Sequence, residues 1–270
     1  MLAEMIKTVI LGIVEGFTEW LPISSTGHMI LVNEIIKNKD CFTSSDLYLY
    51  VIQLGAILAV VTLYFHKLNP FSPKKTKKEK TDTWQMWFKV IAGCVPAAVI
   101  GLILDKYMES FENWLVVSAM LIVYGFAFIL IESRSRKPKI SSMNEMTYKT
   151  ALLIGMFQVL SIIPGTSRSG ATILGAIIIG CSRSVAAEFS FFMAIPVMFG
   201  VSLLKIVKYG LAMSLGDATV LITGMIIAYI VSMLSIKFLM NYVRKHNFKP
   251  FGYYRIILGI AVILYFSFIA

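Results

Sequence analysis

Apolar runs of about 18 residues or more recur along this chain of 270 residues and limit its possible folds more than any other feature. Lipid excludes unpaired backbone groups, so such runs cross a bilayer as helices. Hydrophobic residues make up 57% of the sequence and charged residues only 15%, too few for a soluble surface. We therefore expect an all-α polytopic membrane protein that forms a single integral-membrane domain over residues 1–270, with no cleavable signal peptide.

Six uninterrupted runs predict membrane-crossing helices. Their expected bounds are 47–65, 86–104, 114–131, 185–204, 217–236 and 252–269. The intervening segments alternate in charge: 66–89, 132–149 and 237–255 are rich in Lys and Arg, whereas 105–113 and 205–217 are not. The positive-inside rule places the three basic segments in the cytoplasm and the C-terminus outside. This topology signal also accounts for the net charge of +10, so we expect the bilayer, and no nucleic acid, as a partner.

Two further segments must enter and leave on the same side of the membrane. Residues 148–181 contain "PGTSRSG" at 164–170, and residues 1–37 are interrupted between Pro22 and Gly27. Pro and Gly break helices, and broken backbone is tolerated at membrane depth only inside protein or beside water. Both segments are therefore predicted to be re-entrant hairpins, the first opening outside and the second opening in the cytoplasm.

The two hairpins are related in sequence. The stretch "LGIVEGFTEWLPISSTGH" (11–28) aligns with "IGMFQVLSIIPGTSRSG" (154–170), which is one residue shorter. The alignment places Gly12 on Gly155, Glu15 on Gln158, Pro22 on Pro164 and Ser25 on Ser167. A hairpin and three crossings then occur twice, over about 1–140 and 141–270. Three crossings reverse direction, so the two repeats are predicted to be inverted, with a site near the midplane where the breaks meet.

The polar residues at the two breaks suit an anionic ligand. Free N–H groups at helix N-termini favour phosphate, and Arg168 offers a planar fork to its oxygens. Glu15 and Glu19 share one helix face and could hold a divalent cation or act as a base. A glutamate could also serve only as a helix–helix hydrogen-bond partner, but so many costly groups indicate function. The other candidates are Ser24, Ser25, Thr26, Gly27, His28, Ser167, Ser169, Gly170 and Thr172.

The motifs "EGFTEWLPISSTGH" (15–28) and "PGTSRSGAT" (164–172), with "AAEFSFFMAIPVMFG" (186–200), resemble the undecaprenyl-diphosphate phosphatase, or bacitracin-resistance, family. The resemblance covers essentially the whole chain. It implies a hydrolase of the bacterial cell membrane that converts undecaprenyl diphosphate to the monophosphate with Mg or Ca, recycling the carrier lipid for peptidoglycan synthesis. The family's functional positions correspond here to Glu15, Glu19, Ser24, Ser25, Thr26, His28, Ser167, Arg168 and Thr172.

In this interpretation Glu15, Glu19, Ser25, His28 and Arg168 are catalytic, and the two glutamates also bind the cation. The remaining candidates bind the substrate. The nucleophile stays open between Ser25, His28 and water, and the favoured pair is Ser25 with His28 as its base. The catalytic residues crowd into the first hairpin, so we expect the active site to face outward. The alternative is a transporter or flippase of a polyprenyl phosphate lipid, because inverted repeats with broken helices are typical of transporters. A homo-oligomer is compatible with either function.

Overall fold

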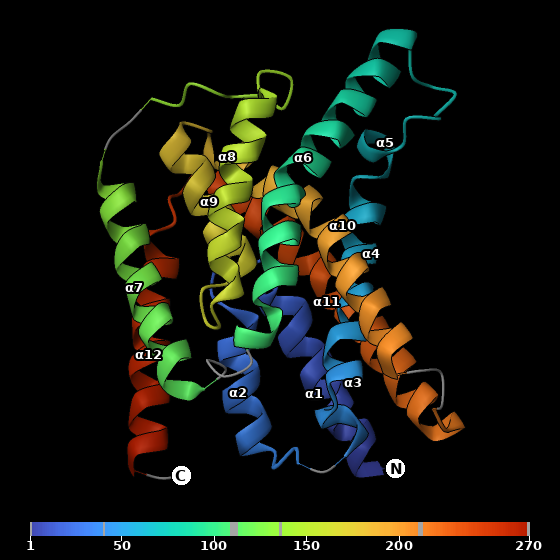
Figure 1. Ribbon diagram of the computed structural model, residues 1–270, viewed down its shortest axis with the longest axis vertical. Coiled ribbons are helices and arrows are strands. Elements are labelled where there is room, and N and C mark those ends of the chain that lie inside the picture. Colours follow the sequence, from blue (N-terminus) through green and yellow to red (C-terminus); the bar gives the residue numbers. More distant parts are fainter. Residues whose placement is uncertain (1, 40, 109–112, 135–136, 210–212, 269–270) are drawn as a thin grey trace.

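The computed structural model describes residues 2–39, 41–108, 113–134, 137–209 and 213–268 (Figure 1). Six helical segments of this part are long and apolar enough to cross a membrane, as predicted. They are α3 (Asp46–Val51) continued by α4 (Gln53–Leu63), α6 (Lys77–Met108), α7 (Trp114–Ser133), α10 (Arg183–Tyr209), α11 (Leu215–Val243) and α12 (Lys249–Phe268). Shorter pieces are η1 (Phe42–Ser44) and α5 (Phe65–Leu68). Residues 109–112 of the expected outer loop lie outside the described residues.

Each of the two other segments is a pair of short helices with a break between them. The first pair is α1 (Leu2–Thr18) and α2 (Ser25–Ile35). The second is α8 (Tyr148–Val159), extended by the turn η3 (Leu160–Ile162), and α9 (Arg168–Ile179). In Figure 1, α1 and α2 rise from the lower part of the molecule and α8 and α9 descend from the upper part, so that the two breaks face each other near the middle. We call residues 19–24 the first break and residues 163–167 the second break.

The first break begins earlier than the position of Pro22 suggests. Helix α1 ends at Thr18, four residues before the proline. The backbone oxygen of Glu19 accepts a hydrogen bond from the hydroxyl of Ser169 (3.1 Å), so it is used outside the helix. A contact with the second hairpin therefore accompanies the end of α1, four residues before Pro22.

The first helix of each hairpin packs against a crossing helix of the other half of the chain. Helix α1 packs on α11, α8 packs on α6, and α7 packs on α12. Glycines allow the backbones to approach: a Cβ on Gly155 would collide with the Gly93 carbonyl, and one on Gly125 would lie 2.8 Å from the Gly252 carbonyl. Small residues at helix crossings are typical of membrane proteins, where packing replaces the hydrophobic effect between helices. These close pairs hold the two breaks in place.

Candidate functional site

The two breaks have the same local backbone geometry. Ser24 and Ser167 both have φ 72°, and each caps the helix that follows. The Ser24 hydroxyl accepts from the N–H of Gly27 (3.3 Å), and the Ser167 hydroxyl accepts from that of Gly170 (3.1 Å). In cap geometry Ser167 therefore matches Ser24, whereas the sequence alignment pairs it with Ser25. The cap, which satisfies a free N–H at the helix start, fixes this register.

Glu19 joins the two breaks through its side chain. Its Oε2 accepts a hydrogen bond from the Ser25 hydroxyl (2.8 Å), and its Oε1 forms an ion pair with Nη2 of Arg168 (3.1 Å). The side chains of Glu19 and Arg168 are each only 10% exposed, so water screens this pair weakly. Nη1 of Arg168 also donates to the carbonyl of Ser190 on α10 (2.9 Å). A carboxylate, a hydroxyl and a guanidinium are thus fixed together at the starts of α2 and α9.

The partners of His28 differ from those expected from the sequence. Its Nδ1 lies 2.7 Å from the carbonyl oxygen of Ser24, and its Nε2 lies 2.7 Å from the hydroxyl of Tyr254, whose ring stacks on it at 5.6 Å. A carbonyl oxygen only accepts, so Nδ1 donates; in the neutral ring Nε2 then accepts from Tyr254. The hydroxyl of Ser25 is bonded to Glu19 rather than to His28.

Two of the predicted substrate-binding hydroxyls, those of Ser169 and Thr172, make hydrogen bonds within the protein. Ser169 is buried and donates to the carbonyls of Glu19 (3.1 Å) and Leu21 (3.2 Å). Thr172 is also buried and shares a hydrogen bond of 2.7 Å with the Ser190 hydroxyl. Thr26 is exposed at the start of α2. Ser169 therefore joins the two hairpins and Thr172 joins α9 to α10, while the more accessible polar groups lie around Ser25.

Buried polar atoms without a protein partner surround the same junction. Within the described part of the chain, Oε1 of Glu15 has no hydrogen bond although this residue is only 2% exposed. The same holds for both amide atoms of Gln158 (1% exposed), the Thr166 hydroxyl and Nε of Arg168. Buried polar atoms are nearly always hydrogen-bonded, so each such group calls for an unseen water, ion or ligand. The junction of the breaks thus has spare hydrogen-bonding capacity inside the protein.

The carboxylates fit a divalent cation only in part. The open Oε1 of Glu15 is the kind of hard oxygen ligand that Mg²⁺ and Ca²⁺ take, but both oxygens of Glu19 already have partners. Among the described residues, no group of three or more His, Cys, Asp or Glu could hold a metal ion. A cation here would therefore take most of its ligands from water and from a bound phosphate, as Mg²⁺ often does.

Two residues of α12 contribute to the site without having been singled out in the sequence. Tyr254 bonds His28, and the fully buried Arg255 donates to the carbonyls of Pro22 in the first break (3.2 Å) and Gly165 in the second (2.9 Å). An arginine within the expected crossing 252–269 was the available signal, because intramembrane charge is usually functional.

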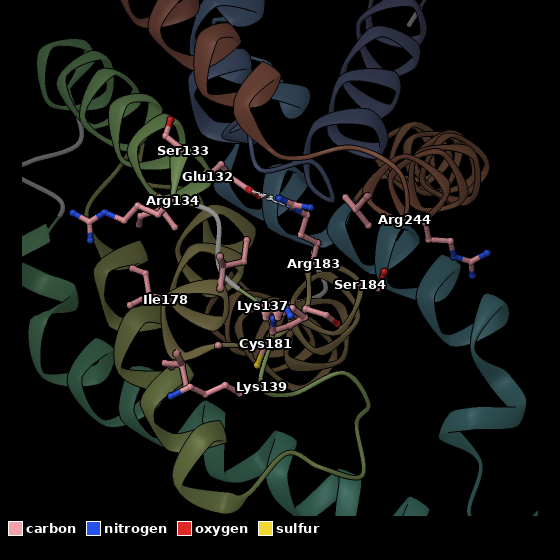
Figure 2. Close-up of a pocket in the computed structure, with 17 residues that line it drawn as sticks. Glu132, Ser133, Arg134, Lys137, Lys139, Ile178, Cys181, Arg183, Ser184 and Arg244 are labelled. Carbon is pink, nitrogen blue, oxygen red and sulfur yellow. Dashed lines mark hydrogen bonds and ion pairs between the residues drawn. The ribbon is translucent and has the colours of Figure 1, made fainter.

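A cavity of about 840 Å³ lies elsewhere, among the ends of α7, α9, α10 and α11 (Figure 2). Its lining includes Lys137 and an ion pair in which Nη2 of Arg183 lies 2.6 Å from Oε2 of Glu132. It touches α9 at Ile177–Ile179, which a rise of 1.5 Å per residue puts roughly 15 Å from Arg168. This cavity is therefore separate from the candidate site.

Comparison with known proteins gives full-length matches. The family described as "Bacitracin resistance protein BacA" matches residues 8–261. The undecaprenyl-diphosphatase of Enterococcus faecalis is 58% identical over 98% of this chain and 99% of its own length. Those of Acetivibrio thermocellus (58% identical, 97% of this chain and 98% of its own length) and Streptococcus thermophilus (57%, 97% and 93%) are similar to the same extent.

Proposed function

The chain belongs to the bacitracin resistance protein BacA family and acts as an undecaprenyl-diphosphatase, and we propose that it does so at the junction of its two helix breaks. The observation that carries this assignment is the bridge made by Glu19, which links Ser25 at the start of α2 to Arg168 at the start of α9. Phosphoryl transfer depends on in-line positioning and charge neutralisation, and this bridge puts a nucleophile and a phosphate ligand in one place.

Ser25 is the proposed nucleophile, and Glu19 rather than His28 accepts its proton. The Ser25 oxygen forms a bond to the terminal phosphorus while the bond from that phosphorus to the bridging oxygen breaks, releasing undecaprenyl phosphate. The proton passes to Oε2 of Glu19, to which the hydroxyl is already bonded (2.8 Å). Water then displaces the serine, which recovers its proton, and inorganic phosphate leaves. The hydrogen bond to Ser24 and the stacked Tyr254 orient His28 beside this reaction.

The substrate's charge is met from both hairpins. Arg168 offers Nε, which has no protein partner, and α2 and α9 direct their N-termini toward the phosphates. Glu15, with its open Oε1, and Glu19 are the residues that would hold a Mg²⁺ or Ca²⁺ ion. Such an ion would neutralise phosphate oxygens and stabilise the charge that develops on them. The lipid tail remains in the bilayer.

The proposed architecture is a pair of inverted repeats, over about 1–140 and 141–270. The exchange of partners between the halves supports it: α1 packs on α11, whereas α8 packs on α6. The matching caps of Ser24 and Ser167 support it as well. With the basic segments in the cytoplasm, the first hairpin opens outward, so the proposed site faces the outer side of the bacterial membrane, where the diphosphate is released after glycan transfer.

The test is phosphate release from a prenyl diphosphate by the purified protein, with Mg²⁺ or Ca²⁺ and with EDTA. We expect release that depends on the cation and that falls at least about hundredfold in Ser25→Ala, the scale of losing a nucleophile or its base. Ser133→Ala is the matched control, because that hydroxyl bonds only a carbonyl of its own helix at the end of α7. Full activity of Ser25→Ala would show that the nucleophile is His28 or water. No phosphate release by the wild-type protein under any condition would contradict the assignment as a phosphatase.

A further inference from the structure

A single buried side chain connects the backbone of the two breaks. Arg255 of α12 is 0% exposed. Its Nη1 donates to the carbonyl of Pro22 (3.2 Å), and its Nη2 donates to those of Gly165 (2.9 Å) and Thr166 (3.0 Å). Glu19 joins the breaks through side chains, whereas Arg255 joins them through the main chain itself. Removing Arg255 would leave three carbonyls of the breaks without this donor.

These carbonyls stand directly before the two helix caps. Thr166 precedes Ser167, and Pro22 lies two residues before Ser24; both serines have φ 72°, which L-residues adopt only when their surroundings impose it. Gly165 has φ 88° and sits against α7, where a Cβ would lie 2.5 Å from the Val117 carbonyl. The guanidinium therefore holds the backbone at the two turns that orient the first N–H groups of α2 and α9.

The charge of Arg255 has no partner of opposite sign. In the part of the chain that the structure describes, Arg255 makes no ion pair. Its guanidinium contacts carbonyl oxygens and the ring of Tyr124, 5.4 Å from the guanidinium carbon. Its Nε has no hydrogen bond. Nη1 also lies against the first turn of α9, since a Cβ on Gly170 would be 3.1 Å from it. A buried charge without compensation is costly, and an anion bound at the starts of these helices would supply the compensation.

A rigid helix pair fixes the position of this guanidinium. Helix α12 packs on α7 so closely that a Cβ on Gly252 would lie 2.7 Å from the Gly125 carbonyl, and one on Gly259 would lie 2.9 Å from the Ser118 carbonyl. Arg255 lies between these two contacts. Helices α7 and α12, which belong to neither hairpin, thus fix the position of both breaks.

We propose that Arg255 is a positioning residue for the phosphatase reaction. It locks the two breaks into one site, so that both helix N-termini meet the same diphosphate, and its charge favours the bound anion. This inference rests on the proposed function, because it assumes that the diphosphate binds between the breaks. Lysine keeps the charge but cannot bond both breaks with a planar fork, and methionine keeps much of the length without the charge.

The experiment compares Arg255→Lys, Arg255→Gln and Arg255→Met with Leu258→Ala. Leu258 is buried on the same helix in a cluster with Val117 and Leu121 of α7, so it reports the cost of loosening α12. Each purified variant is assayed for kcat and KM with a prenyl diphosphate. Its melting temperature is also measured with and without inorganic diphosphate, which probes anion binding apart from catalysis.

We expect kcat/KM to fall at least about tenfold in all three Arg255 variants, and the stabilisation by inorganic diphosphate to be lost in Gln and Met but partly kept in Lys. Leu258→Ala should lower the melting temperature while kcat/KM per folded molecule stays within about twofold. If the Arg255→Gln and Arg255→Met proteins do not accumulate in cells, the kcat/KM of Arg255→Lys tests the inference. Wild-type kcat/KM and diphosphate stabilisation in the Arg255 variants would overturn the inference while leaving the proposed function intact; an inactive wild-type protein would overturn the proposed function itself.

Discussion

The hydroxyl of Ser25 donates to Oε2 of Glu19 at 2.8 Å, while the other oxygen of the same carboxylate pairs with Arg168, 149 residues away in the chain. One carboxylate therefore orients both the proposed nucleophile and the proposed phosphate ligand. Since the two arrive from different hairpins, the site exists only when the hairpins meet.

Glu19→Gln keeps the shape of the side chain but removes its charge. The amide oxygen can still accept from Ser25, but it takes a proton poorly, so we expect kcat to fall at least about hundredfold. Arg168 would lose its ion-pair partner inside the protein, and one-sided removal from a buried pair costs about 3–5 kcal/mol, so the melting temperature should fall as well. Glu34→Gln, which removes an exposed pair with Lys39, is the control and should change neither quantity. An unchanged kcat in Glu19→Gln would exclude Glu19 as the proton acceptor.

Tyr254→Phe removes the hydrogen bond to Nε2 of His28 and keeps the stacked ring. The net value of such a bond is about 0.5–1.5 kcal/mol, so we expect kcat/KM to fall about two- to tenfold. Tyr253→Phe, a neighbouring residue that is 54% exposed, should behave like the wild-type protein. A loss that is equal in both variants would show that His28 is not positioned by Tyr254.

Glu15→Gln tests the proposed cation ligand. The amide is a weaker ligand than the carboxylate, so the Mg²⁺ or Ca²⁺ concentration that gives half-maximal phosphate release should rise at least about tenfold. Saturating cation should then restore part of the activity. The same cation dependence in the wild-type protein and the variant would show that Glu15 does not bind the cation. Its open oxygen would then be hydrogen-bonded to water.

Sidedness can be tested with single cysteines. Lys78→Cys lies on the expected cytoplasmic end of α6 and should react with an impermeant thiol reagent only after the cells are broken. Lys39→Cys, on the exposed turn after α2 and with Cys41 replaced by Ser, should react in intact cells. Labelling of position 78 in intact cells would show that the topology is the reverse of the one expected. The proposed site would then face the cytoplasm.

The elements of the fold could be predicted because they depend on local sequence. Apolar length predicted the crossings, and the Gly and Pro residues of "PGTSRSG" predicted the second break. The contacts within the site could not be predicted, because they join residues that are distant in sequence. The sequence favoured Ser25 with His28 as its base, yet the hairpins bring Arg168 to Glu19, and the Glu19 carboxylate accepts the hydrogen bond of the Ser25 hydroxyl.

Arg255 shows the same limit more clearly. Its sequence neighbourhood, "FGYYRIILG", reads as an apolar helix with one cation, and no nearby motif indicates a partner. Only the packing of α12 on α7 brings it to Pro22 and Gly165, which lie 233 and 90 residues away. Every residue has a backbone carbonyl, so the sequence does not indicate which carbonyls a buried side chain such as Arg255 will bind.

The central claim is that the two breaks form one phosphate-transfer site, and Arg168→Lys tests it most directly. Lysine keeps the charge but loses the fork that serves Glu19, Ser190 and the substrate. We predict that phosphate release by the purified variant falls at least about tenfold, or roughly 1.4 kcal/mol of transition-state stabilisation, with the melting temperature nearly unchanged. Arg183→Lys, an arginine paired with Glu132 at the separate cavity, should keep wild-type turnover. Wild-type turnover in Arg168→Lys, or an equal loss in both variants, would contradict the claim.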